Sequence, residues 1–185
     1  LPAADERALP AGNIANASPI GDTLPFLLVA GAVIEVEGPK TSRKVPIVKF
    51  YKGYKKTVLR PGEWITRVII PKQAANQEVY LYKVSQRRDL DISSVGAAFH
   101  VQKNKQRVDE NKIAYGGVGP NSQRLQKTEK FLTSKLLNRE TLPAAQKILQ
   151  TEITPISDLR ASESFRRRIS SNLLEKFYLD SGGFA

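Results

Sequence analysis

The 185-residue chain contains no cysteine, no methionine and a single histidine. The lack of cysteine excludes disulfides, thiolate zinc sites, cysteine-ligated iron–sulfur clusters and a cysteine nucleophile within this chain. With one histidine, two-histidine metal motifs are excluded, and a Ser-His-Asp triad would have to use His100. His100 lies in a segment that alternates apolar and less apolar residues, so we expect it on the less apolar face of a strand, partly exposed to solvent.

Long hydrophobic runs are also absent. The longest covers residues 24–34 and is interrupted by Pro25 and Gly31. A membrane-spanning helix needs about 20 apolar residues, and the opening LPAADERALP lacks the pattern of a secretory signal, so we expect a cytoplasmic protein without membrane contact. Because translation starts at methionine, a chain that begins at Leu1 is expected to be processed, edited or a piece of something longer.

Acidic residues are few compared with basic ones: the chain has 29 Lys and Arg residues and 18 Asp and Glu residues, which gives a net charge of +11. Such a balance raises nucleic-acid binding as an alternative function, and FYKGYKK at 50–56 has the composition of a single-strand-binding surface. No helix-turn-helix, zinc-finger or RNP signature supports it, so nucleic acid is not the expected partner. The basic run 166–168 is expected to form a solvated helix face or a docking surface for an acidic partner.

The pattern of apolar residues predicts strands first and helices last. Strands are expected within the ranges 32–38, 45–57, 64–71, 79–85, 94–102 and 111–118. Between them we expect a charged turn at 38–44, a linker at 72–78 and a charged loop at 86–92. Helices are expected after Asp22 or Thr23, after Ser122, after Thr141, and from Phe165 to a stop at Gly182 and Gly183. This order indicates an α+β fold.

The segment GNIANASPIGD, residues 12–22, is expected to be an ordered loop that binds a ligand. Gly12 permits close approach to the backbone, Asn13 and Ser18 supply polar groups, and Asp22 supplies a carboxylate. Such a loop suits a ligand with hydroxyls and phosphates; the alternative is a capped structural turn. The glycines of GGVG at 116–119 are a weaker phosphate-binding signal and are explained better as a tight turn before a helix.

Five segments of the chain, in this order, resemble one family. They are GNIANASPIGDTLPFLLVAGAVIEVE, KGYKKTVLRPGEWITRVIIP, YKVSQRRDLDISSVGAAF, KIAYGGVGP and TPISDLRASESFRRRISSNLLEKF. Together they resemble the FAD-binding small subunit of xanthine dehydrogenase, in the molybdenum hydroxylase family. Because the blocks cover nearly the whole range 12–177, the resemblance is specific.

The resemblance implies two parts. Residues 1–72 would be the second half of a vanillate-oxidase-like FAD domain with an antiparallel sheet. Residues 73–185 would be a CO dehydrogenase flavoprotein-like C-terminal domain with a three-stranded antiparallel sheet and C-terminal helices. The family passes electrons from a molybdenum cofactor through 2Fe-2S clusters to FAD and then to NAD. The N-terminal FAD subdomain, the iron–sulfur domain and the molybdenum-cofactor subunit would therefore be partners outside this chain.

The resemblance also carries over cofactor-binding residues by position. Gly12 and Asn13 would lie against the FAD diphosphate and ribityl chain, with Ala17 and Ser18 continuing that wall. Asp22 would accept a hydrogen bond from a flavin-chain hydroxyl. Ile65 would offer backbone contacts, or simply be core. Lys83 would place an ammonium near the flavin and favour its reduced form, or be a solvated strand lysine.

One departure from the family pattern weakens this expectation. The family usually has Thr-Ile-Gly-Gly-Asn at the start of the loop, whereas this chain has Leu9, Pro10, Ala11, Gly12 and Asn13. A hydroxyl, a flexible glycine and a backbone donor are lost, because proline has no N–H. We therefore expect weak FAD binding, or none, by the chain alone, and an inactive flavoprotein fragment is the remaining alternative.

Overall fold

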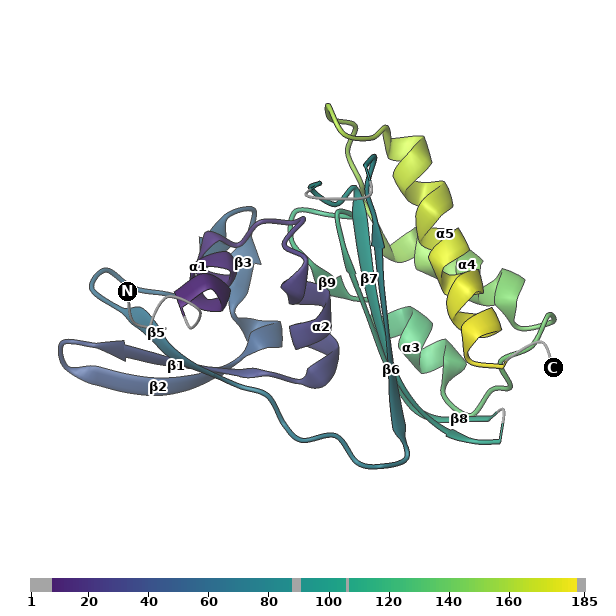
Figure 1. Ribbon diagram of the computed structural model, residues 1–185, viewed down its shortest axis with the longest axis horizontal. Coiled ribbons are helices and arrows are strands. Elements are labelled where there is room, and N and C mark those ends of the chain that lie inside the picture. Colours follow the sequence, from purple (N-terminus) through teal and green to yellow (C-terminus); the bar gives the residue numbers. More distant parts are fainter. Residues whose placement is uncertain (1–7, 88–90, 106, 183–185) are drawn as a thin grey trace.

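The computed structural model describes residues 8–87, 91–105 and 107–182. The elements are, in order, α1 (Ala8–Asn16), α2 (Thr23–Ala30), β1 (Val33–Gly38), β2 (Thr41–Pro46), the short 3-10 helix η2 (Ile47–Lys49), β3 (Tyr51–Gly53), β4 (Lys56–Thr57), β5 (Trp64–Ile69), β6 (Gln77–Val84), β7 (Val95–Asn104), β8 (Arg107–Gly116), β9 (Gln123–Arg124), α3 (Gln126–Leu132), α4 (Leu142–Glu152) and α5 (Glu163–Asp180). Every strand pair is antiparallel, and α3, α4 and α5 follow the last strand (Figure 1). The predicted α+β class is confirmed.

The first sheet has three strands in the order β2-β1-β5, so β1 is central. Ile34 and Val36 of β1 are fully buried, as the alternation predicts. The predicted turn over residues 38–44 is wrong beyond Lys40, because β2 begins at Thr41 and pairs back onto β1. As an edge strand, β2 turns most of its side chains to solvent and therefore lacks the alternation that marks a strand in the sequence.

The second sheet has the order β6-β7-β8-β9. Three strands were expected there, and the fourth, β9, adds only two residues at the edge of β8. Two residues give no readable period, which is why the sequence does not reveal this strand. Helices α3, α4 and α5 cover one face of the sheet and α2 covers the other, so the sheet forms the middle layer (Figure 1).

Strands β7 and β8 contribute to both hydrophobic cores of the protein. Ala97 and Phe99 point toward α5, where Phe99 stacks on Phe177 with ring centroids 4.5 Å apart. Ala98 and Ala114 point the other way and pack with α2 and the first sheet. Small residues on that face let α2 lie close against the strands. The two sheets are thus joined through α2 rather than by strand pairing.

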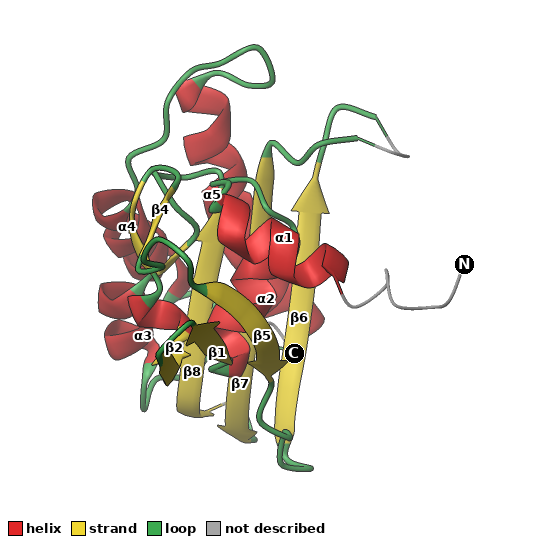
Figure 2. Cartoon of the chain, turned by 90° about the vertical axis from the view of Figure 1, so that its left-hand side faces the viewer, coloured by secondary structure: helices red, strands yellow, loops and turns green. Residues whose placement is uncertain are grey.

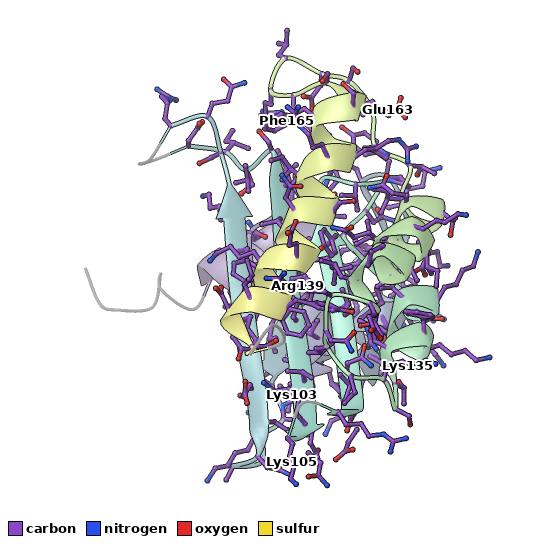
Figure 3. All side chains as sticks on the ribbon, turned by 90° about the vertical axis from the view of Figure 1, so that its right-hand side faces the viewer. Lys103, Lys105, Lys135, Arg139, Glu163 and Phe165 are labelled. Atoms are coloured by element: carbon purple, nitrogen blue, oxygen red, sulfur yellow. The ribbon has the colours of Figure 1, made fainter. Side chains whose placement is uncertain are left out.

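Helices α2, α4 and α5 begin close to the expected positions. Asp22 is the N-cap residue of α2, and Pro25 lies in its first turn. Thr141 is the N-cap residue of α4. Helix α5, which carries Glu163 and Phe165 at its start in Figure 3, is capped by the Ser162 hydroxyl, which accepts a 3.1 Å hydrogen bond from Phe165 N–H.

The ends of two helices differ from prediction or extend beyond it. The predicted N-cap at Ser122 is wrong: α3 begins at Gln126, and the Ser122 hydroxyl donates instead to the Pro19 carbonyl. After α5 the chain turns at Gly182 with a φ of +78°, a conformation that favours glycine. Gly183, the other predicted stop residue, lies outside the described residues.

The segment 12–22 is not a loop throughout, because α1 continues to Asn16. Ile14 is fully buried in the core beneath the first sheet, and its carbonyl accepts a hydrogen bond from the Tyr51 hydroxyl at 3.2 Å. Packing of this one side chain stabilises a helix whose small and polar residues give a weak helical signal. Residues 1–7, expected to be an irregular lead-in, lie outside the described residues, as do residues 88–90 of the predicted charged loop.

His100 is buried, contrary to the expectation of a partly exposed position. It lies on the face of β7 that also carries Ala98, opposite Lys112 of β8, and α2 covers that face. Burial lowers the pKa of His100, and the positive charge of Lys112 acts in the same direction. The face of β7 that the sequence pattern marks as less apolar therefore lies inside the protein.

Candidate functional site

Asp22 occupies the N-cap position of α2, but its side chain makes no capping hydrogen bond. One carboxylate oxygen accepts a hydrogen bond from the Lys83 ammonium at 2.7 Å. The other accepts from the hydroxyl of Ser93, which is buried just before β7. Three separate segments of the chain therefore hold this carboxylate in place.

Lys83 lies on β6, at the outer edge of the second sheet, where it pairs with Gly96 of β7. The side chains of Lys83 and Asp22 are 46% and 49% exposed, so the ion pair faces solvent. An ion pair this exposed contributes little to stability, typically about 0–1 kcal/mol. Both groups are thus available to an incoming ligand at small cost to the fold.

Gly12 and Asn13 lie on the exposed side of α1. A methyl group added at Gly12 would meet no atom within 4 Å, so the helix surface is open there. The Asn13 amide oxygen accepts a 3.3 Å hydrogen bond from the Thr23 hydroxyl, next to Asp22. Gly21 closes the turn between the two helices, and a side chain at that position would approach the Asn13 oxygen to 2.8 Å.

Ala17 and Ser18 form the connection after α1. Ala17 has a φ of +50°, and the whole residue is only 1% exposed, so neither its side chain nor its backbone faces solvent. The Ser18 hydroxyl accepts a hydrogen bond from Ile20 N–H at 3.4 Å. Ser18 faces the larger of two cavities described below, whereas Gly12 and Asn13 do not line it.

Ile65 lies on β5, opposite Val36 of β1. Its half-buried side chain packs against the core between α2 and the first sheet. Helix α1 lies beside β5, the strand that carries Ile65 (Figure 2). Of the seven predicted site residues, the structure directly joins Asp22 with Lys83 and places Asn13 beside them.

A small cavity of about 120 Å³ adjoins the Asp22–Lys83 pair. It lies between the start of α2 and strands β6 and β7, and its lining is otherwise apolar, with Phe26 and Leu81 among the contributors. The carboxylate and the ammonium thus stand at the rim of an apolar recess. A recess of this volume is smaller than the roughly 300 Å³ or more of a typical ligand pocket, so it has room for only part of a ligand.

A larger cavity of about 480 Å³ lies where four loops meet. Its apolar lining includes Ile20, Tyr54 and Ile156, and its cations include Lys55 and Arg160. Gly117 contributes backbone from the loop between β8 and β9. Gly117 has a φ of +80°, and a side chain there would lie 2.4 Å from the Ser94 carbonyl, so the loop requires glycine.

Arg166 holds the loops around this cavity together. Its guanidinium donates to the carbonyls of Ser94 and Gly117 at 2.6 and 2.9 Å and to both Asp158 oxygens at 2.8 Å. Burial acts against ionisation of Asp158, but hydrogen bonds from Arg160 N–H, Arg166 and Ala161 N–H lower its pKa overall. Arg166 is buried, so the expectation of a solvated or docking face over 166–168 is wrong for this residue.

Sequence reasoning missed Ser93, Thr23 and the anchoring role of Arg166. Ser93 and Thr23 belong to no sequence motif that would predict their hydrogen bonds, Ser93 to Asp22 and Thr23 to Asn13. Arg166 belongs to a run of three arginines that a charge count treats alike. A signal did exist: the four-residue spacing from Phe165 to Phe177 places Arg166 next to the buried stripe of α5.

Within the described ranges 8–87, 91–105 and 107–182, no three acidic or histidine side chains form a group that could hold a metal ion. No helix in those ranges has both the length and the hydropathy needed to cross a bilayer.

Two family matches together cover most of the chain. Residues 6–73 match the FAD binding domain in molybdopterin dehydrogenase, and residues 80–181 match the CO dehydrogenase flavoprotein C-terminal domain. The chain therefore belongs to the family of FAD-binding flavoproteins of the molybdenum hydroxylases.

Among individual proteins, the chain is 36% identical over 182 residues to xanthine dehydrogenase of Blastobotrys adeninivorans, covering 92% of this chain and 13% of that protein. The fold matches carbon monoxide dehydrogenase from Hydrogenophaga pseudoflava with a TM-score of 0.84 and 25% identity, over 89% of this chain and 57% of that one. It also matches quinoline 2-oxidoreductase from Pseudomonas putida 86 with a TM-score of 0.80 and 25% identity, over 94% and 61% of the two chains. The chain thus spans only part of the length of each relative.

Proposed function

We propose that this chain supplies one wall of an FAD site in the electron-transfer part of a xanthine dehydrogenase-like oxidoreductase. The observation that carries the proposal is the exposed Asp22–Lys83 pair, held by Ser93 beside the open surface of α1. In this proposal residues 1–72 complete their FAD domain with a separate N-terminal subdomain. An iron–sulfur domain and a molybdenum-cofactor subunit are the expected further partners, and a cytoplasmic location stays a prediction.

The residues at this wall fit the polar groups of FAD. Asp22 offers carboxylate lone pairs to ribityl hydroxyls, and Asn13 offers an amide that both donates and accepts. The open surface at Gly12 leaves room for the chain of a ligand to lie on the backbone. Lys83 places a positive charge at the wall, which stabilises added negative charge on a bound group. FAD, when bound, would supply the redox chemistry, and the protein would orient it.

The larger cavity is a candidate site for part of the electron acceptor NAD. Its volume of about 480 Å³ lies in the range typical of small-molecule sites. Tyr54 offers a ring for stacking against a base, and Lys55 and Arg160 offer positive charge for a diphosphate. A ligand-detected binding experiment that compares NAD binding by Arg160→Ala with NAD binding by the control Arg168→Ala tests this assignment. We expect Arg160→Ala to bind NAD more weakly than the control does. Equal binding by both variants would refute it.

A flavin-fluorescence titration tests the FAD proposal. The chain is titrated alone and then together with the N-terminal FAD subdomain of a relative. We expect saturable binding that requires the added subdomain and weakens about tenfold in Asp22→Ala, because a hydrogen bond to a charged group contributes about 1.5 kcal/mol or more. Asp109→Ala, which removes an exposed carboxylate on β8, is the matched control and should bind like the parent.

Two results would overturn the proposal. Tight stoichiometric binding by the chain alone would show that the site is complete without a partner. Absence of binding with the subdomain present would leave the chain as a flavoprotein fragment that has lost its flavin function.

A further inference from the structure

The positive charge of the chain is concentrated in one segment. Residues 38–72 contain ten Lys and Arg side chains and one acidic side chain, Glu63, and so carry nine of the eleven net charges. Glu63 is already paired with Arg43 at 2.7 Å. Little negative charge is therefore left within the segment to balance the rest.

Four of these cations form what we call the lysine ribbon: Lys49, Lys52, Lys55 and Lys56. They lie on η2, on the two short strands β3 and β4, and on the turn between the strands. All four are exposed, and none has an ion-pair partner among the described residues. Because β3 and β4 pair antiparallel, Gly53 opposite Lys56, the ammonium groups share one short hairpin, whose strand β4 is visible in Figure 2.

The aromatic residues between the ribbon lysines argue against single-stranded nucleic acid as the partner, because such a strand binds by stacking successive bases on several exposed rings. Phe50 is fully buried, and Tyr51 is half-buried with its hydroxyl bound to the Ile14 carbonyl. Only Tyr54, which is 59% exposed, presents its ring to solvent. Two of the three aromatics that suggested nucleic acid thus belong to the fold.

We propose that the lysine ribbon docks an acidic protein surface on a neighbouring domain or subunit. Like charges gathered without counter-charges repel one another, and an acidic partner relieves that repulsion. Val48, just before the ribbon, and Tyr54, between Lys52 and Lys55, are exposed and offer apolar contacts beside the charges, as protein interfaces use. The chain covers 13% to 61% of its relatives, so further protein is present beside this module in those proteins. The inference does not depend on FAD binding.

The test uses the 185-residue chain and two labelled probes of nearly equal charge, a 20-residue polyglutamate peptide and the oligonucleotide dT20. The triple variant Lys49→Glu, Lys52→Glu, Lys56→Glu removes the ribbon, and Lys55 is left because it lines the larger cavity. The control Lys127→Glu, Lys130→Glu, Lys147→Glu changes net charge equally, at exposed lysines on α3 and α4. Lysine acetylation, read by mass spectrometry with and without the peptide, reports which side chains are covered.

We expect peptide affinity to fall about tenfold or more in the ribbon variant and less than about twofold in the control. Acetylation of the ribbon lysines should drop when the peptide binds, and dT20 affinity should not respond to Tyr54→Ala. No peptide binding, or equal weakening in the control, would overturn the proposal. A loss of dT20 affinity of about threefold or more in Tyr54→Ala would reveal base stacking and identify nucleic acid as the partner instead.

Discussion

Asp22 illustrates how far a single residue can be interpreted from sequence. Its place at the start of α2 follows from the helix pattern that begins there. Its ion pair with Lys83 does not, because the two residues lie 61 positions apart and meet only once β6 is placed beside α2. The buried Ser93 hydroxyl adds a third contact that only the packed structure provides.

The carboxylate of Glu63 makes stability depend on acid pH. Hydrogen bonds from Arg43 and from Arg60 N–H lower the pKa of Glu63 to about 2. Because this pKa lies below the ordinary value of 4.5, the ionised form stabilises the folded state fully above pH 4.5. That contribution is lost as pH falls from about 4.5 to about 2.

Thermal melting of Glu63→Gln and the parent chain between pH 7 and pH 2.5 measures this effect. The parent should melt at higher temperature at neutral pH, and the difference should shrink steadily below pH 4.5. A difference that stays constant across the range would contradict the assignment, and one that grows on acidification would reverse its sign.

Arg166 and Arg168 are close neighbours in sequence, but their substitution should affect stability to very different extents. Arg166→Met removes a buried cation that binds two carbonyls and the Asp158 carboxylate, and should cost about 3 kcal/mol of unfolding free energy. Arg168→Met changes an exposed side chain and should cost less than about 0.5 kcal/mol. Urea unfolding of both variants distinguishes an anchoring role from a general charge effect, which would lower stability equally in both.

Among the elements, those with strong periodicity are the ones the sequence predicts. Helix α5 has apolar residues every four positions, and strand β7 alternates apolar with less apolar residues from Val95 to Val101. Helix α1 and strand β2 lack such patterns, and the sequence therefore predicts a loop and a turn in their place. Their formation depends on partners outside the segment itself: the distant Tyr51 for α1, and the adjacent hairpin strand β1 for β2.

Helix α5 is held against the second sheet chiefly by Phe177. Its ring stacks on Phe99 and meets the rings of Tyr80 and Tyr178 edge-on. Phe177→Ala should therefore cost about 3–5 kcal/mol of unfolding free energy. Leu179→Ala, on the exposed side of the same helix, should cost less than about 1 kcal/mol in the same denaturation experiment. Similar losses for both would mean that helical propensity rather than packing holds α5.

For the molecule as a whole, the shared strands β7 and β8 couple the two cores. The one tryptophan, Trp64, reports on the first sheet, and far-ultraviolet circular dichroism is dominated by the helices, most of which pack on the second. We expect both signals to change in a single coincident unfolding transition. Leu28→Ala in α2 and Phe177→Ala in α5 should each shift both signals together. Separate midpoints would show two independent folding units.

The connection between β5 and β6 is exposed and forms no strand pairs. Residues 70–76 are exposed and pair with neither sheet (Figure 1). Trypsin acting after Lys72 would therefore sever the backbone without removing any packing of α2 on β7 and β8. The nicked protein should migrate as two bands in a denaturing gel yet elute from a sizing column as one species, which makes this connection a natural point for expressing the two halves as separate, self-associating chains.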